Sequence, residues 1–460
     1  MAYQAIVCKV KNVRPHPNAD KLKLATVQGS QIIVSLDQKE DELGVFFLSD
    51  GMIMSEHCIQ NKLYTKDPET GEAWPGYFSL NGRVKPLKLR GEVSEGFWQP
   101  LKAFKWTGKI DELVEGYQFD TLNGHKICQK YYTPATLKAM NRKKNPKKGK
   151  TNVIKVDRSN MHEHYDTKQL RFELNKIPPG AIITVTEKLH GTSGRTGYVC
   201  STKLKFNPFK LGWNVFSGKV NVLATKVSRK HKLLKPLKNL SLGYFELKRK
   251  EAGKFWEHVS GSRRVVIDPH VEYQGFYNGD PFRDKIHNKI VETGLQKGEV
   301  LYYEIVGFQD KGSPLMGIYN IADKDLKKQY GKQMAFTYGC ECPTCDFYVY
   351  RIAHINEDGY EVDLPISQVR ARCEQLGHKV VPQLCDPFIY DGDQEALVNK
   401  LRPYTDGPST LDKNHIREGI VVKVEHEKMH CGLKFKGDSF CLIEGIRKQD
   451  PAYVDTEEIS

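Results

Sequence analysis

The chain lacks the features of a secreted or membrane protein. None of its apolar runs approaches the roughly 18 residues needed to cross a bilayer. The chain starts with MAYQAIVCKVKNV, which holds neither a long apolar stretch nor a small-residue cleavage site. Its 11 cysteines are an odd number, scattered along 460 residues, which argues against a disulfide framework. We therefore expect reduced thiols, a cytoplasmic or nuclear location and no membrane contact.

Acidic residues are scarce in two segments. The whole chain has 70 Lys and Arg against 56 Asp and Glu, a net charge of +14. Residues 138–158 hold nine basic residues and one acid, and residues 203–264 hold sixteen basic residues and three acids. Positive charge confined to two segments is typical of polyphosphate binding, although it also suits a solvated surface. We favour a nucleic-acid partner.

Helical periodicity is missing from the first part of the chain. In residues 1–125, short apolar runs alternate with glycine turns, which predicts a small β-barrel. Residues 126–159 are rich in lysine and predict a basic linker, which could hold phosphate, be a nuclear import signal or serve only as a hinge. Residues 160–445 show mixed α and β patterns, and 446–460 form a C-terminal tail.

The residues that indicate chemistry follow one another in this second part. Lys188 comes just after a β-rich run, with Gly191 three residues on, so phosphate can approach the backbone closely. Five further elements follow the Lys188 motif. Each one, taken alone, could be an ordinary salt bridge or a solvated strand, but all six elements in this order are hard to obtain by chance. The later elements are Arg263 before a strand, Glu304 within a strand, Tyr350 in an aromatic strand, Glu418 before a buried strand, and Lys434 and Lys436 on one strand face.

This series resembles the motifs of covalent nucleotidyltransferases, namely polynucleotide ligases and capping enzymes. The run Glu187-Lys188-Leu189-His190-Gly191-Thr192 is most similar to the phage RNA ligase 2 group. The run HPNADKL at His16–Leu22 resembles OB domains of a bacterial ligase branch and of tRNA-binding proteins. Only 24 residues follow Lys436, too few for the C-terminal OB domain of DNA ligases and capping enzymes. ATP is favoured over NAD because no N-terminal extension of the NAD-dependent type is seen.

The resemblance implies an α+β fold. It consists of an N-terminal OB-type β-barrel followed by a nucleotidyltransferase (ATP-grasp-like ligase) domain of two antiparallel sheets with flanking helices. The implied function is an ATP-dependent RNA ligase, acting as a monomer on broken RNA ends, nicked duplex RNA or RNA–DNA hybrid. The alternatives are an RNA capping guanylyltransferase and a non-catalytic RNA-binding protein. Because every adenylation motif follows residue 160, we expect a fragment of about residues 155–460 to adenylate itself.

The resemblance also implies a role for each site residue. Lys188 attacks the α-phosphate of ATP to form lysyl-AMP, and AMP then passes to the RNA 5′-phosphate. Lysine attacks as the neutral amine, which nearby cations favour. The catalytic set is Lys188, Glu418, Lys434 and Lys436, with Glu418 also steering a largely water-coordinated Mg²⁺ or Mn²⁺. The cofactor-binding set is Glu187 at the adenine edge, Gly191, Arg263 near the RNA end, Glu304 at the ribose, Tyr350 on the adenine ring, Lys434 and Lys436.

Some positions depart from the family pattern or stay open. Phe is more usual than Tyr350 on adenine, so Phe347 or Phe336 could stack instead, and Arg351 stands where an acid is frequent. The segment 203–254 is either an RNA-contacting insert, with basic residues among Phe206, Phe209, Trp213 and Phe216, or a subdomain with its own core. Cys340, Cys342 and Cys345 could ligate zinc with His354, Cys373 or Cys385, but no second C-x-x-C exists, so we predict no zinc.

Overall fold

The N-terminal domain is a β-barrel-like arrangement of short strands. A computed structural model describes residues 3–144, 156–205, 208–230, 250–267, 281–451 and 453. Strand β1 has both faces covered, because alternation sends Ala5 and Val7 into one core and Ile6 and Cys8 into another. The N-terminal strands before β13 are β1 Ala5–Lys9, β2 Lys11–His16, β3 Ala19–Val27, β4 Ser30–Ser35, β5 Leu43–Leu48, β6 Gly51–Ile53, β7 Leu87–Leu89, β8 Glu92–Ser94, β9 Gly96–Pro100, β10 Gln118–Phe119, β11 Thr121–Leu122 and β12 His125–Lys126. Helix α1 spans Ser55–Gln60, and a 3-10 helix, η1, spans Leu101–Thr107.

The range 126–159, expected to be a linker, begins with structure that belongs to this domain. Strand β13 (Cys128–Lys130) pairs with β6, since Ile127 and Cys128 are fully buried apolar residues of the OB core. Helix α2 (Pro134–Lys144) follows, with proline in its first turn, where no N–H is needed. Residues 145–155, the centre of the basic segment, lie outside the described residues.

Two large sheets form most of the second domain, which also has a two-stranded sheet of β21 Ile318–Asn320 and β22 Gln333–Ala335. The larger sheet runs in the order β19-β18-β17-β20-β23-β24, with β14 on β17, and the smaller runs β15-β27-β26-β16-β25. All these pairings are antiparallel except β15 with β27, which are parallel. Their bounds are β14 Val156–Asp157, β15 Lys168–Gln169, β16 Ile182–Lys188, β17 Thr192–Lys205, β18 Lys250–Ser262, β19 Val266–Ile267, β20 Glu299–Gly307, β23 Cys345–Ile355, β24 Glu361–Asp363, β25 Phe388–Ile389, β26 Gly419–His426 and β27 Met429–Lys436.

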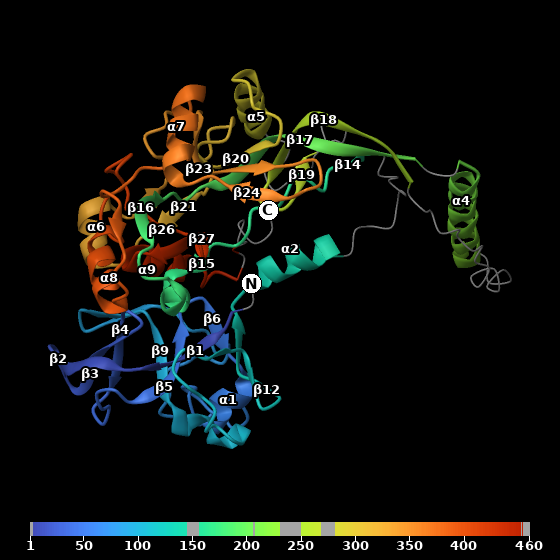
Figure 1. Ribbon diagram of the computed structural model, residues 1–460. Helices are drawn as coiled ribbons and strands as arrows, with labels where there is room; N and C mark the ends of the chain where they lie inside the picture. Colours follow the sequence, from blue (N-terminus) through green and yellow to red (C-terminus); the bar gives the residue numbers. More distant parts are fainter. Residues whose placement is uncertain are drawn as a thin grey trace.

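Helices flank both sheets, so the α+β architecture has a layered core (Figure 1). The α5 and α7 helices pack on the larger sheet, whereas α3 and α8 pack on the smaller one. No helix in the described ranges is both long and apolar enough to cross a membrane. The helices are α3 Leu170–Glu173, α4 Pro208–Lys230, α5 Phe282–Glu292, α6 Lys324–Tyr330, α7 Ile366–Leu376, α8 Gln394–Leu401 and α9 Asp438–Arg447.

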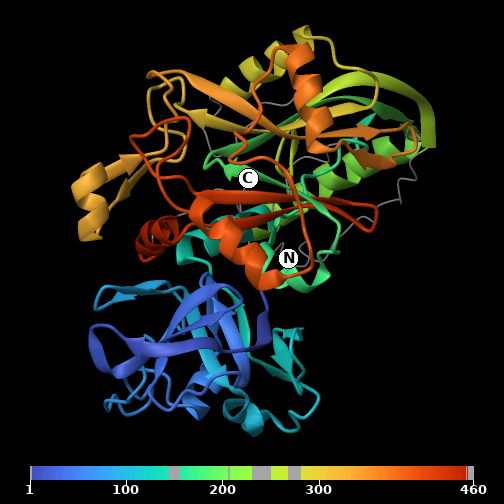
Figure 2. The same cartoon turned by 60° about the vertical axis from the view of Figure 1, so that its left-hand side comes forward.

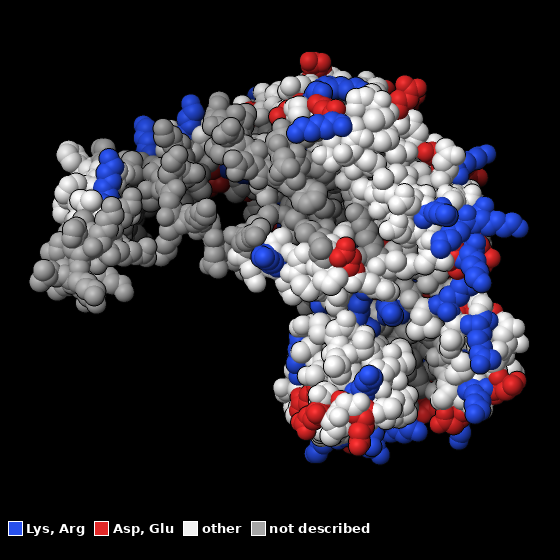
Figure 3. All heavy atoms as spheres, turned by 180° about the vertical axis from the view of Figure 1, so that it is seen from behind, with Lys and Arg blue, Asp and Glu red and all other residues white. Residues whose placement is uncertain are grey.

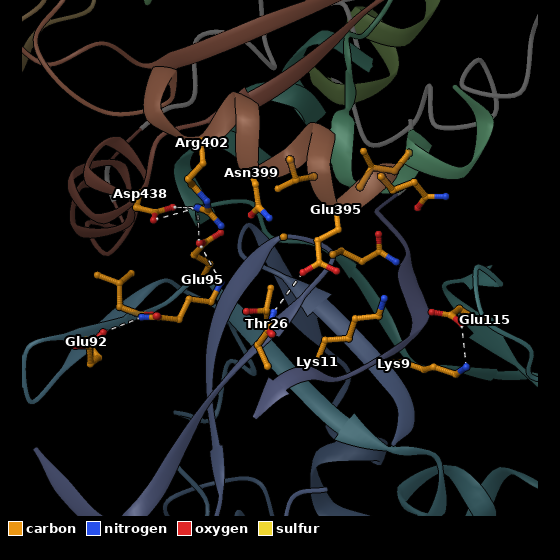
Figure 4. Close-up of a pocket in the computed structure, with 18 of the residues that line it drawn as sticks. Lys9, Lys11, Thr26, Glu92, Glu95, Glu115, Glu395, Asn399, Arg402 and Asp438 are labelled. Atoms are coloured by element: carbon orange, nitrogen blue, oxygen red, sulfur yellow. Dashed lines mark hydrogen bonds and ion pairs between the residues drawn. The ribbon is translucent and has the colours of Figure 1, made fainter. Parts of the chain in front are cut away.

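The two domains face each other across α8 and α9. Figures 1 and 2 show the N-terminal domain on one side of α9 and the two-sheet domain on the other. A cavity of about 520 Å³ separates the OB sheet from α8 (Figure 4). Direct contacts close the remaining interface, among them the ion pair of Lys88 with Asp323 at 2.9 Å, which ties β7 to the start of α6.

Candidate active site

Strand register brings the predicted lysines and glutamates together. In the smaller sheet Lys188 pairs with Gly419, and Gly419 pairs in turn with Lys436. Glu418 immediately precedes that shared position, so its side chain reaches both lysines. Lys434 lies two residues before Lys436 on the same strand, and period-two alternation puts both on one face.

Glu418 is the electrostatic centre of this cluster. Its Oε2 lies 2.7 Å from Lys188 Nζ, its Oε1 lies 3.4 Å from Lys436 Nζ, and His190 Nδ1 is 3.4 Å away. Glu418 is fully buried, and burial by itself raises a carboxyl pKa. The charges of Lys188 and Lys436 outweigh that effect and hold the pKa of Glu418 well below its usual range. The carboxylate is therefore ionised and pairs with both lysines, which leaves the three groups with a net positive charge.

A cavity of about 100 Å³ opens beside Lys188. Of the residues proposed from the sequence, six line it, whereas Gly191, Glu418 and Lys436 lie next to it. The six are Glu187, Lys188, Arg263, Glu304, Tyr350 and Lys434. The two sheets thus bring residues from distant parts of the chain to one pocket.

Glu187 offers an acceptor to this cavity. Its Oε2 accepts hydrogen bonds from the backbone N–H of Thr410 at 2.9 Å and from the Thr410 hydroxyl at 2.5 Å. Its Oε1 is buried and has no hydrogen-bond partner among the described residues. A buried acceptor left open is costly, so this oxygen suits a donor group on a bound ligand.

Glu304 is held in place by the backbone of Gly191, three residues after Lys188. Its Oε1 accepts from the backbone N–H of Gly191 at 3.1 Å, and its Oε2 accepts from the Ser193 hydroxyl at 3.2 Å. A Cβ on Gly191 would lie 2.2 Å from the carbonyl oxygen of Ile305. Only glycine fits this close strand contact.

Tyr350 is the aromatic residue of β23 that lines the cavity. The two alternatives pack elsewhere: Phe347 lies in the core against α5 and α7, and Phe336 packs against His190 and Tyr319. Arg351, next in the strand, points away into a different cluster. It stacks on the rings of Tyr165 and Tyr302, with its Cζ 4.6 and 4.2 Å from their centroids, and pairs with Glu361 and Asp363 at 2.8 and 2.6 Å.

Sequence reasoning missed the segment that covers the cavity from the other side. His164 and Tyr165 line it, and the His164 ring centroid lies 5.0 Å from that of Tyr350. Burial, together with the charges of Arg351 and Arg263, holds the pKa of His164 well below its usual range, so the ring is neutral. This segment lies outside the motif series, and residues 162–167 have no regular secondary structure.

Arg263 is fixed by that same segment. Its side chain pairs with Asp166, and its carbonyl accepts a hydrogen bond from the backbone N–H of His164 at 3.2 Å. Lys423 was also missed as a site residue, although it follows Glu418 in the same motif. It lines the cavity, donates to the Tyr350 carbonyl at 2.9 Å, and burial lowers its pKa to about 8.

Two regions left open by the sequence lie apart from this cavity. Helix α4 sits at the end of the long ribbon of β17 and β18 (Figure 1), and Phe209, Trp213 and Phe216 on it are exposed; Phe206 lies outside the described residues. Cys340 and Cys345 have a pKa raised to about 11, chiefly by burial. Within the described ranges, no three His, Cys, Asp or Glu side chains are grouped as a metal site.

An OB domain is joined to two facing sheets, and a lysine, a glutamate and two further lysines lie at or beside one cavity. A family model described as RNA ligase matches residues 181–440, and a model of an OB-fold domain matches residues 4–101. The first match covers more than half of the chain, so the chain belongs to the RNA ligase family. No curated protein matches the chain.

Solved structures agree on the fold. A lysine-to-alanine variant of the Naegleria gruberi RNA ligase with ATP and Mn is 16% identical, with a TM-score of 0.52, and the match covers 98% of this chain and 99% of that one. A lysine-to-methionine variant of that ligase with AMP and Mn has a TM-score of 0.53 at 16% identity, covering 95% and 97%. The predicted family and the predicted α+β fold with an N-terminal OB domain are confirmed.

Proposed function

We propose that this chain is an ATP-dependent RNA ligase that joins a 3′-hydroxyl to a 5′-phosphate through lysyl-AMP and RNA-adenylate. The observation that carries the proposal is the position of Lys188. It lies at the cavity wall, paired with the buried Glu418, while Lys434 lines the same cavity and Lys436 contacts the same carboxylate.

Three displacements at phosphorus account for these residue types. First, Lys188 Nζ, as the neutral amine, attacks the α-phosphorus of ATP, the bond from that phosphorus to the bridging β-phosphate oxygen breaks, and pyrophosphate leaves; the nitrogen gives one proton to solvent and keeps the other. Second, an oxygen of the RNA 5′-phosphate attacks the same phosphorus and the P–N bond to Lys188 breaks. Third, the 3′-hydroxyl attacks the RNA 5′-phosphorus and AMP leaves. Lys434 and Lys436 would offset the charge that develops on the transferred phosphate.

The cavity suits an adenine nucleotide. The open Oε1 of Glu187 can accept a hydrogen bond from the exocyclic amino group of adenine, and Tyr350 offers a ring face. Glu304 lies on the opposite sheet, where it would meet the ribose. Structures of the Naegleria ligase that contain ATP or AMP support this choice of nucleotide.

Glu418 is the residue that would hold a divalent ion. The described part of the chain has no cluster of three ligands, so phosphate and water would complete the coordination, as Mg²⁺ prefers. Bound there, Mg²⁺ or Mn²⁺ would supply positive charge that neutralises the phosphates and favours the neutral lysine amine. The Mn in the Naegleria ligase structures supports the same assignment.

Nicked duplex RNA, or an RNA–DNA hybrid, is the substrate that we propose. Figure 3 shows Lys and Arg side chains on both domains along one edge of the molecule. Exposed basic residues on the described surface include Lys85 and Arg90 of the OB domain and Lys327 and Lys328 of α6. Cations on both domains would follow the phosphates on both sides of a break.

The test separates the three functions with one reagent pair. Purified protein is incubated with Mg²⁺ and ATP or GTP labelled at the α-phosphate. We expect covalent label from ATP, discharged when nicked RNA duplex is added. Label from GTP would support the capping alternative, and label from neither nucleotide would support a non-catalytic RNA-binding protein.

A further inference from the structure

Helix α9 connects the active site to the OB domain. It starts two residues after Lys436, and its inner face packs Phe440 and Ile443 into the core that also holds Leu189, next to the nucleophile. Its other side faces the OB domain (Figures 1 and 2). Whatever moves α9 therefore moves the backbone that carries Lys436.

A continuous series of opposite charges runs along this helix. Glu418 is followed by Lys436 at 3.4 Å, and Lys436 by Glu444 at 3.0 Å. Glu444 is followed by Lys448 at 3.2 Å, and Lys448 by Asp50 of the OB domain at 2.9 Å. Lys436, Glu444 and Lys448 are 12%, 13% and 6% exposed, so solvent screens the pairs among them little. Asp50 is 32% exposed, so its pair with Lys448 is screened more.

The charge of Lys436, at the active-site end of the series, affects the pKa of Asp50. Burial raises its pKa, but the charges of Lys448 and of Lys436 together hold it well below the usual range. Asp50 occupies the turn between β5 and β6 with a φ of 82°, a conformation that Asp and Asn tolerate. Its carboxylate is thus ionised and held by the fold in front of Lys448.

The OB domain also fixes α9 at two other points. Arg83 is buried and donates to the carbonyl of Gly445 at 3.0 Å, near the end of the helix. At the beginning of the helix, Arg402 lies between Glu95 at 3.0 Å and Asp438 at 3.4 Å (Figure 4). These contacts leave α9 with its first and last turns held against the OB domain.

We propose that the OB domain positions Lys436 for nucleotide transfer, with Asp50, Lys448 and Glu444 as the positioning residues. Glu444 is shared between Lys436 and Lys448. Asp50 draws Lys448 toward the OB domain, and without its charge Lys448 would compete for Glu444 and release Lys436. The inference rests on the proposed role of Lys436 in adenylation, and it opposes the expectation that residues 155–460 suffice for that step.

The experiment measures self-adenylation of the full-length protein in the absence of RNA. Asp50→Asn removes the charge and tolerates the positive φ. We expect the maximal rate of adenylation to fall about five- to tenfold, with little change in the KM for ATP, because a misplaced group costs transition-state stabilisation. Glu444→Gln should also slow self-adenylation. The double variant with Asp50→Asn should be no slower than Glu444→Gln alone, since both residues act on Lys436 through the same chain of ion pairs.

Lys88→Met is the matched control. It removes OB-domain ion pairs to Asp323 and Asp325, at 2.9 and 2.8 Å, that do not touch α9. Adenylation by this variant should stay within about twofold of the unmodified protein, and melting temperatures would show that each variant is folded. Equal losses in Lys88→Met and Asp50→Asn would indicate general loosening of the domains and overturn the proposal.

Three further outcomes are decisive. Independent, multiplying losses from Asp50→Asn and Glu444→Gln would overturn a shared route to Lys436. If Lys436→Ala abolishes adenylation while Asp50→Asn leaves it normal, the inference fails and the proposed function stands. If Lys436→Ala itself adenylates normally, both the role of Lys436 and the positioning proposal are wrong.

Discussion

Changing Glu418 to Gln tests the charge balance on which the proposed reaction depends. The substitution keeps the volume and removes one negative charge from a fully buried site. Glu418 lies 2.7 Å from Lys188 and 3.4 Å from Lys436, so the variant leaves two neighbouring ammonium groups with no carboxylate between them. Removing one partner of a buried ion pair costs about 3–5 kcal/mol, part of which Lys188, 18% exposed, can avoid by turning toward the cavity.

For the reaction we expect Glu418→Gln to slow self-adenylation by at least about 10²-fold, because Glu418 holds Lys188 and Lys436 in place and would hold the divalent ion, and the loss of one preorganised electrostatic group costs about that much. The assay follows transfer of labelled AMP to the protein in single-turnover conditions over a series of Mg²⁺ and Mn²⁺ concentrations. Glu427→Gln, an exposed position in the next turn, is the control. A folded Glu418→Gln variant that adenylates within about tenfold of the control would refute the assigned role of Glu418.

Three other measurements, two on variants and one on the unmodified protein, have definite expected outcomes. Glu187→Gln should raise the KM for ATP about tenfold and reduce the preference for ATP over GTP, because a carboxylate accepts a hydrogen bond from the adenine amino group and repels the guanine carbonyl oxygen. An unchanged preference for ATP over GTP would contradict the placement of Glu187 at the adenine edge. Gly191→Ala should destabilise the protein by about 1–3 kcal/mol in thermal or denaturant unfolding, since its Cβ would lie 2.2 Å from the Ile305 carbonyl oxygen, and an unchanged stability would mean that the strands do not meet so closely. Metal analysis should find less than one zinc per chain, whereas stoichiometric zinc lost on changing Cys342 and Cys345 to Ser would establish a structural site.

The sequence predicted those site residues that lie at the end of a strand, each within its own short motif. Short local patterns indicate Lys188, Glu418 and Lys436. The antiparallel register of β16, β26 and β27 then brings these three residues together. Period-two spacing also placed Lys434 beside Lys436, because alternation is a local property. Family, fold class and domain order followed from the same motifs.

Contacts between distant segments could not be predicted in this way. Asp50 and Lys448 are 398 residues apart, and nothing in either local sequence indicates the other. The same holds for His164, whose place over the cavity depends on its backbone hydrogen bond to Arg263. The lysine-rich composition of residues 126–159 predicted a linker, although Ile127 and Cys128 belong to the OB core. An average over 34 residues does not detect a short buried strand.

In the proposed reaction Lys188 carries AMP from ATP to RNA, and comparing two substrates with one variant is the sharpest test of that role. Lys188→Ala removes the nucleophile and leaves Glu418, Lys434 and Lys436 in place. We expect no label from ATP and no sealing of a nicked RNA duplex with ATP, but measurable joining of the same duplex carrying a 5′-adenylate, since that step does not use the amine. Sealing with ATP at the unmodified rate by Lys188→Ala would contradict the account.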